Sequence, residues 1–149
     1  MLKLAQETLI EAPAGTVFDV ITDLPRYAEW NPWIIKAAGT PTEGATIQVR
    51  SLVGGRPLRV DHRILRSVQD REFRWCDLGW FTRLAYGQRG RWLEPRGDGR
   101  VSYRVELTIT GVLSPIVKAV LGRSLAWGLE AETRALKQRA ESLVARAAS

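Results

Sequence analysis

The chain contains one histidine, His62, and this side chain is the best candidate for acid–base chemistry near neutral pH. His62 lies in a segment, 58–64, in which every second residue is apolar or histidine and the residues between are charged. That alternation predicts a half-buried strand with His62 on its inner face. There His62 would orient a ligand carbonyl or act as a general acid or base. It would equally serve as a core side chain that only hydrogen-bonds to its neighbours, and both interpretations stay open.

No second group completes a catalytic set with His62. Cys76 follows Trp75 in a strand, so it faces the opposite way, and it has no histidine partner at a readable spacing. Asp19, Asp23 and Glu29 lie on or after a short helix, and we expect them to be solvated or to cap it. A single cysteine excludes an internal disulfide and a cysteine-rich metal site. We therefore expect no metal, no cofactor and no covalent nucleophile.

Several aromatic and apolar side chains are expected on the same inner face as His62. Large aromatic groups that each carry one donor suit a pocket for a mostly apolar ligand, although core packing explains them as well. The predicted ligand-binding residues are His62, Trp75, Trp92, Tyr103, Val105, Leu107, Leu125 and Leu129. Trp30 and Trp33 are expected to pack two short helices against the rim of the sheet, or to gate a cavity there.

The elements that position these residues follow from two periodicities. Period-two patterns and turn residues predict a first strand over 3–11 and later strands from about 34, then over 47–51, 58–64, 73–75, 82–94 and 101–109. Helical spacing predicts a helix from about 12 to 24, a short helix or turn over 26–30, and a long helix over 115–145 with Ser114 as its N-cap. Gly87 and Gly90 indicate a bulge or a close backbone approach. Gly122 and Gly128 either allow close contact with the sheet or leave space under the long helix.

This order of elements predicts an α+β fold. One amphipathic helix covers six strands only if the sheet curls around it. We therefore expect a curved antiparallel sheet of six to seven strands wrapped around the C-terminal helix, with two short helices after the first strand, in a single domain over 1–149. The helix and the sheet would enclose a cavity of roughly 300 Å³ or more, the usual lower size of a ligand pocket.

The chain is basic, with 22 Lys and Arg against 16 Asp and Glu and a net charge of +6. The charge is mostly arginine spread along the chain, which favours solvated surface positions over a nucleic-acid site. Arg50, Arg59, Arg63 and Arg74 are expected on the outer face of the sheet, where a basic strip would contact an anionic membrane or RNA. Without interleaved exposed aromatics we do not expect nucleic acid as a partner. No segment reads as a signal peptide or membrane span, so we expect a soluble cytoplasmic protein, as a monomer or homodimer.

The chain also resembles a known family, most clearly in its N-terminal third. The run APAGTVFDVITD at 12–23 continues into LPRYAEWNPW at 24–33, and the last helix contains ALKQRAE at 135–141. These segments resemble the START/Bet v 1-like superfamily (SRPBCC), in particular its polyketide cyclase/dehydrase-like branch. The resemblance covers nearly the whole chain. It implies the helix-grip fold and a cavity for a lipid, sterol, quinone, polyketide or other hydrophobic molecule.

One segment departs from the pattern of that family, which carries a histidine and an aromatic residue in the strand before a Leu-Glu-Pro segment. Here that strand reads QRGRW at 88–92. Arg89 and Arg91 would make the pocket less apolar, or a bulge would turn them outward. Binding of a hydrophobic molecule without catalysis is the leading hypothesis. The alternatives are a cyclase or dehydratase in which His62, Tyr103 or an arginine steers an aldol-like closure, and an interaction module that uses the basic sheet face.

Overall fold

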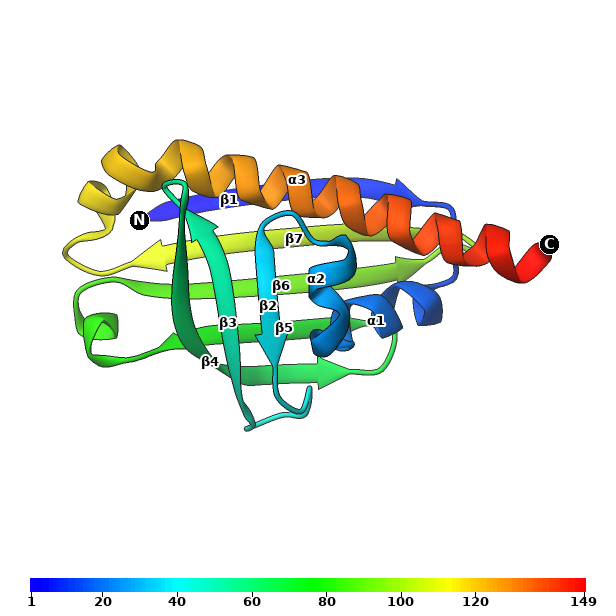
Figure 1. The fold of residues 1–149 in the computed structure, drawn as a ribbon, viewed down its shortest axis with the longest axis horizontal. Helices are drawn as coiled ribbons and strands as arrows, with labels where there is room; N and C mark the ends of the chain where they lie inside the picture. The colour runs from blue at the N-terminus through cyan, green and yellow to red at the C-terminus, as the bar shows by residue number, and fades with distance from the viewer.

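The computed structural model describes all 149 residues and shows a sheet with one long helix laid along it (Figure 1). The strands are β1 (Leu2–Ile10), β2 (Ile34–Ala38), β3 (Thr46–Val53), β4 (Arg56–Val68), β5 (Glu72–Leu78), β6 (Tyr86–Pro95) and β7 (Val101–Thr110). The helices are α1 (Ala14–Thr22), η1 (Leu24–Arg26), α2 (Tyr27–Trp30), η2 (Trp80–Arg83) and α3 (Ser114–Ala148). None of these helices combines the length and the hydropathy that a bilayer crossing requires.

All seven strands form one antiparallel sheet in the order β1-β7-β6-β5-β4-β3-β2. Its curvature is concentrated in β4, the longest strand, whose pairing with β5 shifts register between Ile64 and Arg66. β4 turns at this irregularity, so that its first half, paired with β3, runs with β3 and β2 across the direction of the other strands (Figure 1). A bulge of this kind bends a strand and increases its twist. The sheet therefore wraps around α3, which confirms the predicted α+β helix-grip architecture.

The structure decides between the two roles expected for Gly87 and Gly90, and it corrects the role expected for Ser114. Gly87 and Gly90 do not form a bulge, because β6 pairs with β7 in continuous register through both positions. They are instead places of close approach, since a Cβ on Gly87 would lie 2.5 Å from the Asp77 carboxylate. Ser114 is not a side-chain cap either. It is buried as the first residue of α3, and its backbone N–H donates to the Gly111 carbonyl at 3.0 Å.

The core lies between the inner sheet face and the buried stripe of α3. Leu125, Leu129, Leu136 and Ala140 recur at helical spacing and are buried there, as the sequence pattern predicts. α1 and α2 close the end of the fold that lies under the second half of α3 (Figure 1). The first half of α3 has no such cover beneath it, and this is where the candidate site lies.

Candidate functional site

The inner face of the sheet presents a row of side chains fixed by strand register. Trp75 on β5 is directly opposite Arg89 on β6, and Arg89 is directly opposite Leu107 on β7. His62 on β4 is opposite Asp77, two residues after Trp75. Residues opposite each other, or two apart on one strand, share a face of a sheet. Four adjacent strands therefore direct these side chains to the same side, toward α3.

A cavity of about 210 Å³ lies between this row and the first half of α3. Val117, Leu121 and Leu125 of α3 form its roof, and strands β3 to β7 with the segment after β5 form its other walls. Most of the lining is apolar. Leu58, which is 49% exposed, marks where the cavity reaches the surface.

The cavity is smaller than the roughly 300 Å³ expected from the sequence. The reason is that Trp33 and Arg89 fill the middle of the space under α3. The Arg89 guanidinium carbon lies 4.3 Å from the centre of the Trp33 ring and 5.4 Å from that of Trp75. On one side of this stack is the cavity, and on the other the side chains pack as solid core.

His62 and Asp77 form a hydrogen-bonded pair in the cavity wall. His62 Nε2 lies 3.0 Å from Asp77 Oδ1, and the Gly87 backbone N–H donates to Asp77 Oδ2 at 3.0 Å. The glycine allows this approach because any side chain there would collide with the carboxylate. The other ring nitrogen, His62 Nδ1, is buried without a partner. In such a pair the carboxylate orients the imidazole, whose other nitrogen can then accept a proton.

A buried ionic cluster adjoins the inner end of the cavity, where Arg89 is its one member in the lining. Arg89 Nη1 lies 3.0 and 3.2 Å from the two Glu132 carboxylate oxygens, and Arg91 Nη2 lies 2.7 Å from Glu132 Oε1. The Asn31 side-chain amide donates to Glu132 Oε2 at 2.9 Å, and its own Oδ1 accepts from the backbone N–H groups of Trp33 and Ile34. The cluster thereby joins α3, β6 and the start of β2.

Burial and the neighbouring charges together set the pKa values of the ionisable groups in this cluster. Burial alone would raise the pKa of Glu132, but the charges of Arg89 and Arg91 outweigh it and lower the pKa to about 2. Burial lowers the pKa of Arg89, while for Arg91 the neighbouring Tyr27 and Glu132 more than offset burial and raise the pKa. Arginine stays charged in either case, so two guanidinium charges face one carboxylate.

Two tyrosines adjoin the cluster on the core side. Burial raises the pKa of Tyr27 to about 12, and its hydroxyl donates to the Ile21 carbonyl at 2.5 Å. Burial also raises the pKa of Tyr103, whose hydroxyl is buried without a partner. Both side chains are therefore neutral at physiological pH, and neither lines the cavity.

The structure divides the predicted ligand-binding residues into three groups. The cavity is lined by His62, Trp75, Leu107 and Leu125. Packed in the core beyond the ionic cluster are Tyr103, Val105 and Leu129. Trp92 was expected to face inward, and this is wrong: Arg89 and Arg91 face α3, so Trp92 lies on the outer face, over Gly90 and beside an open hollow lined by charged side chains.

Sequence reasoning missed Asp77 and Glu132 and left the direction of Arg89 and Arg91 open. Asp77 had a signal, because it stands two residues after Trp75 and so shares its face. Glu132 had a weaker signal as the one charged residue in the buried helical stripe between Leu129 and Leu136. Buried charges are nearly always paired, so that position predicts a cationic partner. Trp33, which was expected to pack the short helices against the sheet rim or to gate the cavity, is buried beneath the long helix, where its ring contacts Gly128.

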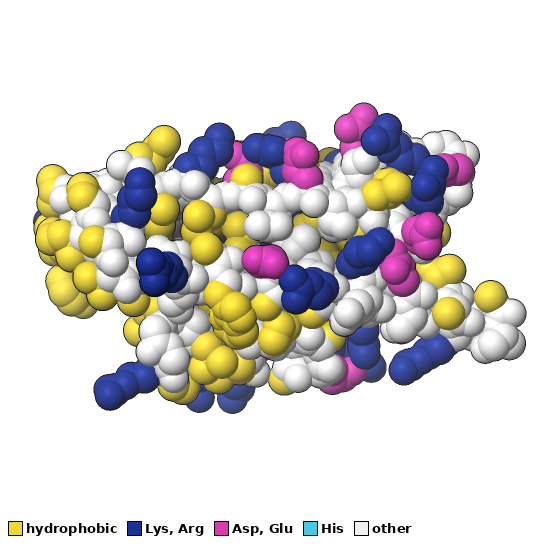
Figure 2. Space-filling model, turned by 90° about the horizontal axis from the view of Figure 1, so that it is seen from above, with side chains coloured by type: hydrophobic (Ala, Val, Ile, Leu, Met, Phe, Trp, Pro, Cys, Tyr) yellow, Lys and Arg dark blue, Asp and Glu magenta, His cyan; other side chains and the backbone are white.

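The surface around the cavity opening is apolar and basic. Figure 2 shows hydrophobic side chains gathered at the end of the molecule where α3 begins, with Lys and Arg beside them. Exposed apolar residues at this end are Leu58, Trp80, Leu84, Val112, Leu113, Ile116 and Val120. The Leu113 backbone N–H donates to the Leu84 carbonyl at 2.9 Å, and the Gly54 N–H donates to Ser124 Oγ at 2.9 Å. These bonds hold the segments that surround the opening.

The chain matches a family model described as polyketide cyclase / dehydrase and lipid transport, over residues 1–141. A START superfamily protein from Mycobacterium smegmatis has a similar structure at 17% identity, with a TM-score of 0.75 over 95% of this chain and 98% of that chain. The Zhui aromatase/cyclase from Streptomyces sp. R1128 is 15% identical, with a TM-score of 0.73 over 96% of this chain and 95% of that one. Ara h 8.0201 is 15% identical, with a TM-score of 0.67 over 95% and 98%.

No curated protein matches the sequence. At these identities the structural likeness speaks only for the fold, and the START/Bet v 1-like neighbours agree with the architecture described above. The family model, by contrast, covers nearly all of the chain. This protein therefore belongs to the polyketide cyclase/dehydrase and lipid transport family.

Proposed function

We propose that this protein binds a small hydrophobic molecule, without chemical change, in the cavity between the sheet and the first half of α3. The observation that carries the proposal is the cavity itself, with mostly apolar walls and a few polar groups at defined places. Ligand pockets generally have this composition. At about 210 Å³ the cavity takes a small molecule, or the end of a longer one whose remainder lies in the opening near Leu58.

The test fills the cavity and measures uptake of a neutral fluorescent probe, N-phenyl-1-naphthylamine. Val60→Phe adds an aromatic ring to the cavity wall on β4, and Val68→Phe makes the same change on the same strand outside the cavity. We expect Val60→Phe to weaken probe binding about tenfold or more and Val68→Phe to leave it close to wild type. Equal binding by all three proteins would overturn the proposal. If Val60→Phe alone weakens binding, native mass spectrometry of protein from its own host is the measurement that identifies the natural ligand.

A second candidate function is a cyclase or dehydratase, and the His62–Asp77 pair is the observation that favours it. In an aldol closure His62 would take a proton from the carbon between two carbonyls. That carbon would form the new bond to the carbon of a further ketone along the chain, the C=O double bond would open to an alkoxide, and the proton held by His62 would pass to that alkoxide. Tyr103 has no role in this reaction because it does not line the cavity. The test compares turnover of a poly-β-ketone by wild type and by His62→Ala. Equal turnover by the two proteins would rule out this function for His62.

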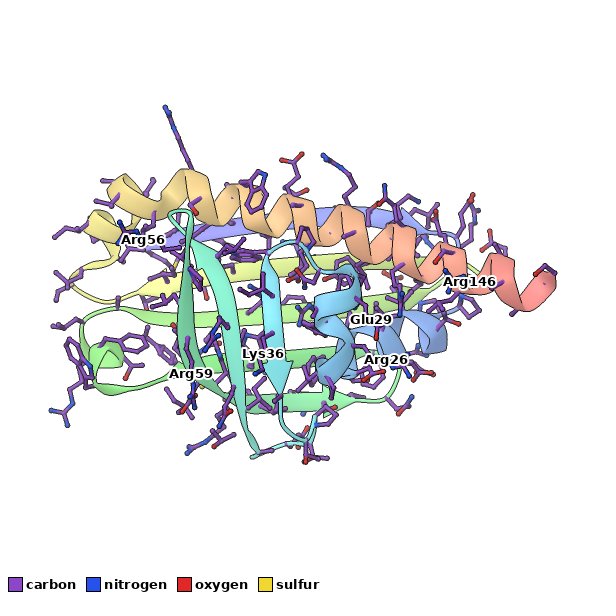
Figure 3. The ribbon with its side chains drawn as sticks, in the orientation of Figure 1. Arg26, Glu29, Lys36, Arg56, Arg59 and Arg146 are labelled. Atoms are coloured by element: carbon purple, nitrogen blue, oxygen red, sulfur yellow. The ribbon has the colours of Figure 1, made fainter.

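We further propose that the end of the molecule around the opening docks on an anionic membrane. Trp80 and Val112 there are 82% and 75% exposed. Arg56, Arg83, Lys118 and Arg123 are exposed at the same end, and segments 54–60, 78–86 and 107–129 contain no Asp or Glu. Figure 3 shows Arg56 at the tip of the β3–β4 hairpin, beside the first half of α3.

Apolar and tryptophan side chains surrounded by basic ones are typical of interfacial membrane contact, and each basic residue near an anionic surface contributes about 1 kcal/mol. A second copy of the chain fits less well, because self-association through this end would oppose like charges. The outer sheet face, which the sequence also suggested as a basic surface, is a weaker candidate for this membrane contact. Arg59 and Arg74 there pair with Asp61 and Glu72 at 3.5 and 2.8 Å.

A further inference from the structure

We propose that the ligand of the cavity carries an acid group, such as a carboxylate, at one end of its apolar body, and that this group binds at Arg89. The inference rests on the proposed binding function and adds the chemical class of the ligand. It also gives the direction of binding, with the acid group at the inner end of the cavity and the apolar part toward the opening near Leu58.

The first observation is the state of Arg89. This side chain lines the cavity, is only 6% exposed, and lies between the rings of Trp33 and Trp75. Its hydrogen bonds to Glu132 run through Nη1 alone, and its Nε is buried without a partner. A buried guanidinium N–H without an acceptor costs free energy, and a ligand oxygen would satisfy it.

The second observation is the charge around Arg89. Arg89 and Arg91 together face the single carboxylate of Glu132. The one carboxylate among the residues that line the cavity, Asp77, is bonded through one oxygen to His62 and through the other to the Gly87 N–H. Neither Asp77 oxygen bonds to Arg89. The inner end of the cavity therefore has a guanidinium with donor capacity left over, and charge-assisted bonds from arginine to a carboxylate are among the strongest polar contacts in proteins.

A third observation concerns His62, whose Nδ1 is the other unpartnered nitrogen of the cavity wall. The His62 and Arg89 side chains flank the same Trp75 ring: the His62 ring centre lies 5.5 Å from it and the Arg89 guanidinium carbon 5.4 Å. Both unpartnered nitrogens therefore belong to side chains that lie next to the same ring of the cavity wall. The imidazole accepts a bond from a protonated acid or donates one to an ionised acid. A neutral ester or a simple alcohol also offers oxygen acceptors, but it has no negative charge to pair with the Arg89 guanidinium.

The test compares three probes of the same chain length, octanoate, octanol and methyl octanoate, by isothermal titration calorimetry on the full chain. We expect octanoate to bind wild-type protein about tenfold or more tightly than either neutral probe. Arg89→Gln should bring that ratio close to one and Arg89→Lys should retain part of it. The matched control is Arg63→Gln, which removes an exposed arginine from the outer face of β4 and should leave the ratio unchanged.

The outcomes separate this inference from the proposal beneath it. Equal binding of octanoate and octanol to wild-type protein would overturn the acid-group inference while supporting a binding cavity. A preference for octanoate that survives Arg89→Gln would also overturn it, because the anion would then bind elsewhere. If no probe binds, and Val60→Phe and wild type also behave alike toward the neutral fluorophore, the proposed function itself fails. The wild-type comparison of acid with ester needs no variant, so poor folding of Arg89→Gln leaves the inference open to refutation.

Discussion

Trp33 packs directly on the backbone of Gly128, so closely that a Cβ on this residue would lie 2.3 Å from the indole ring. The indole N–H donates to the Leu52 carbonyl at 3.0 Å, which fixes the ring between α3 and β3. This contact lets α3 approach the sheet at the point where the cavity ends and the ionic cluster begins. Of the two roles expected for glycines in the long helix, Gly128 has that of close approach.

The first prediction follows from this contact. Gly128→Ala should lower the free energy of unfolding by up to about 2 kcal/mol, because a contact at 2.3 Å places the cost at the upper part of the about 1–3 kcal/mol typical of overpacking, above the roughly 1 kcal/mol gained in helix propensity. Gly122→Ala is the matched control in the same helix. Its Cβ would meet only Lys118 Cγ at 3.9 Å, so this variant should be more stable by up to about 1 kcal/mol. Urea denaturation of both proteins measures the difference, and stabilisation by both changes would contradict the packing argument.

The second prediction concerns the ionic cluster. Glu132→Gln keeps the shape of the side chain but leaves Arg89 and Arg91 as uncompensated buried charges. Breaking a buried ion pair on one side typically costs about 3–5 kcal/mol, so we expect a loss of that order in chemical denaturation. Glu130→Gln removes an exposed carboxylate that pairs with Arg134 on the same helix, and should change stability by no more than about 0.5 kcal/mol. Similar small effects from both changes would show that the cluster does not hold the fold together.

Acid should weaken the fold through the same residue. The pKa of Glu132 is about 2 in the folded protein against an ordinary value of 4.5, so the unfolded chain takes up the proton first. The contribution of Glu132 is complete above about pH 4.5 and is lost as the pH falls toward about 2. We expect the stability difference between wild type and Glu132→Gln to shrink over this interval in urea titrations at successive pH values. Parallel stability curves for the two proteins would argue against a lowered pKa.

The proposed membrane contact makes a further prediction. Wild-type protein should sediment with vesicles that contain phosphatidylglycerol, less with pure phosphatidylcholine vesicles, and less again when the salt concentration is raised. Trp80→Ser should reduce binding several-fold, because it removes the most exposed large apolar side chain at the opening. Leu65→Ser changes an exposed apolar residue of β4 away from the opening and serves as the control. A concentration-dependent dimer that Trp80→Ser abolishes would instead assign this surface to self-association.

How much the sequence could predict depended on how regular each segment is. β7 alternates without interruption from Val101 to Thr110, so the inward direction of Tyr103, Val105 and Leu107 could be read from it directly. β6 carries Gly87, Gly90 and two arginines, and its alternation is therefore masked. The expected inward direction of Trp92 was wrong, because the direction of Arg89 and Arg91 was left open and the pairing of both arginines with the buried Glu132 turns them inward.

The sequence by itself determined the order of the elements, the inner face of most strands and the stripe of α3 that is buried, since these follow from periods of two and 3.6 residues along one segment. Only the tertiary structure decided where the inner face is cavity and where it is core. That division depends on contacts between residues far apart in the chain: Trp33 against Gly128, Arg89 against Glu132, and His62 against Asp77. Packing and charge pairing across the curled sheet set these contacts, and no local pattern records them.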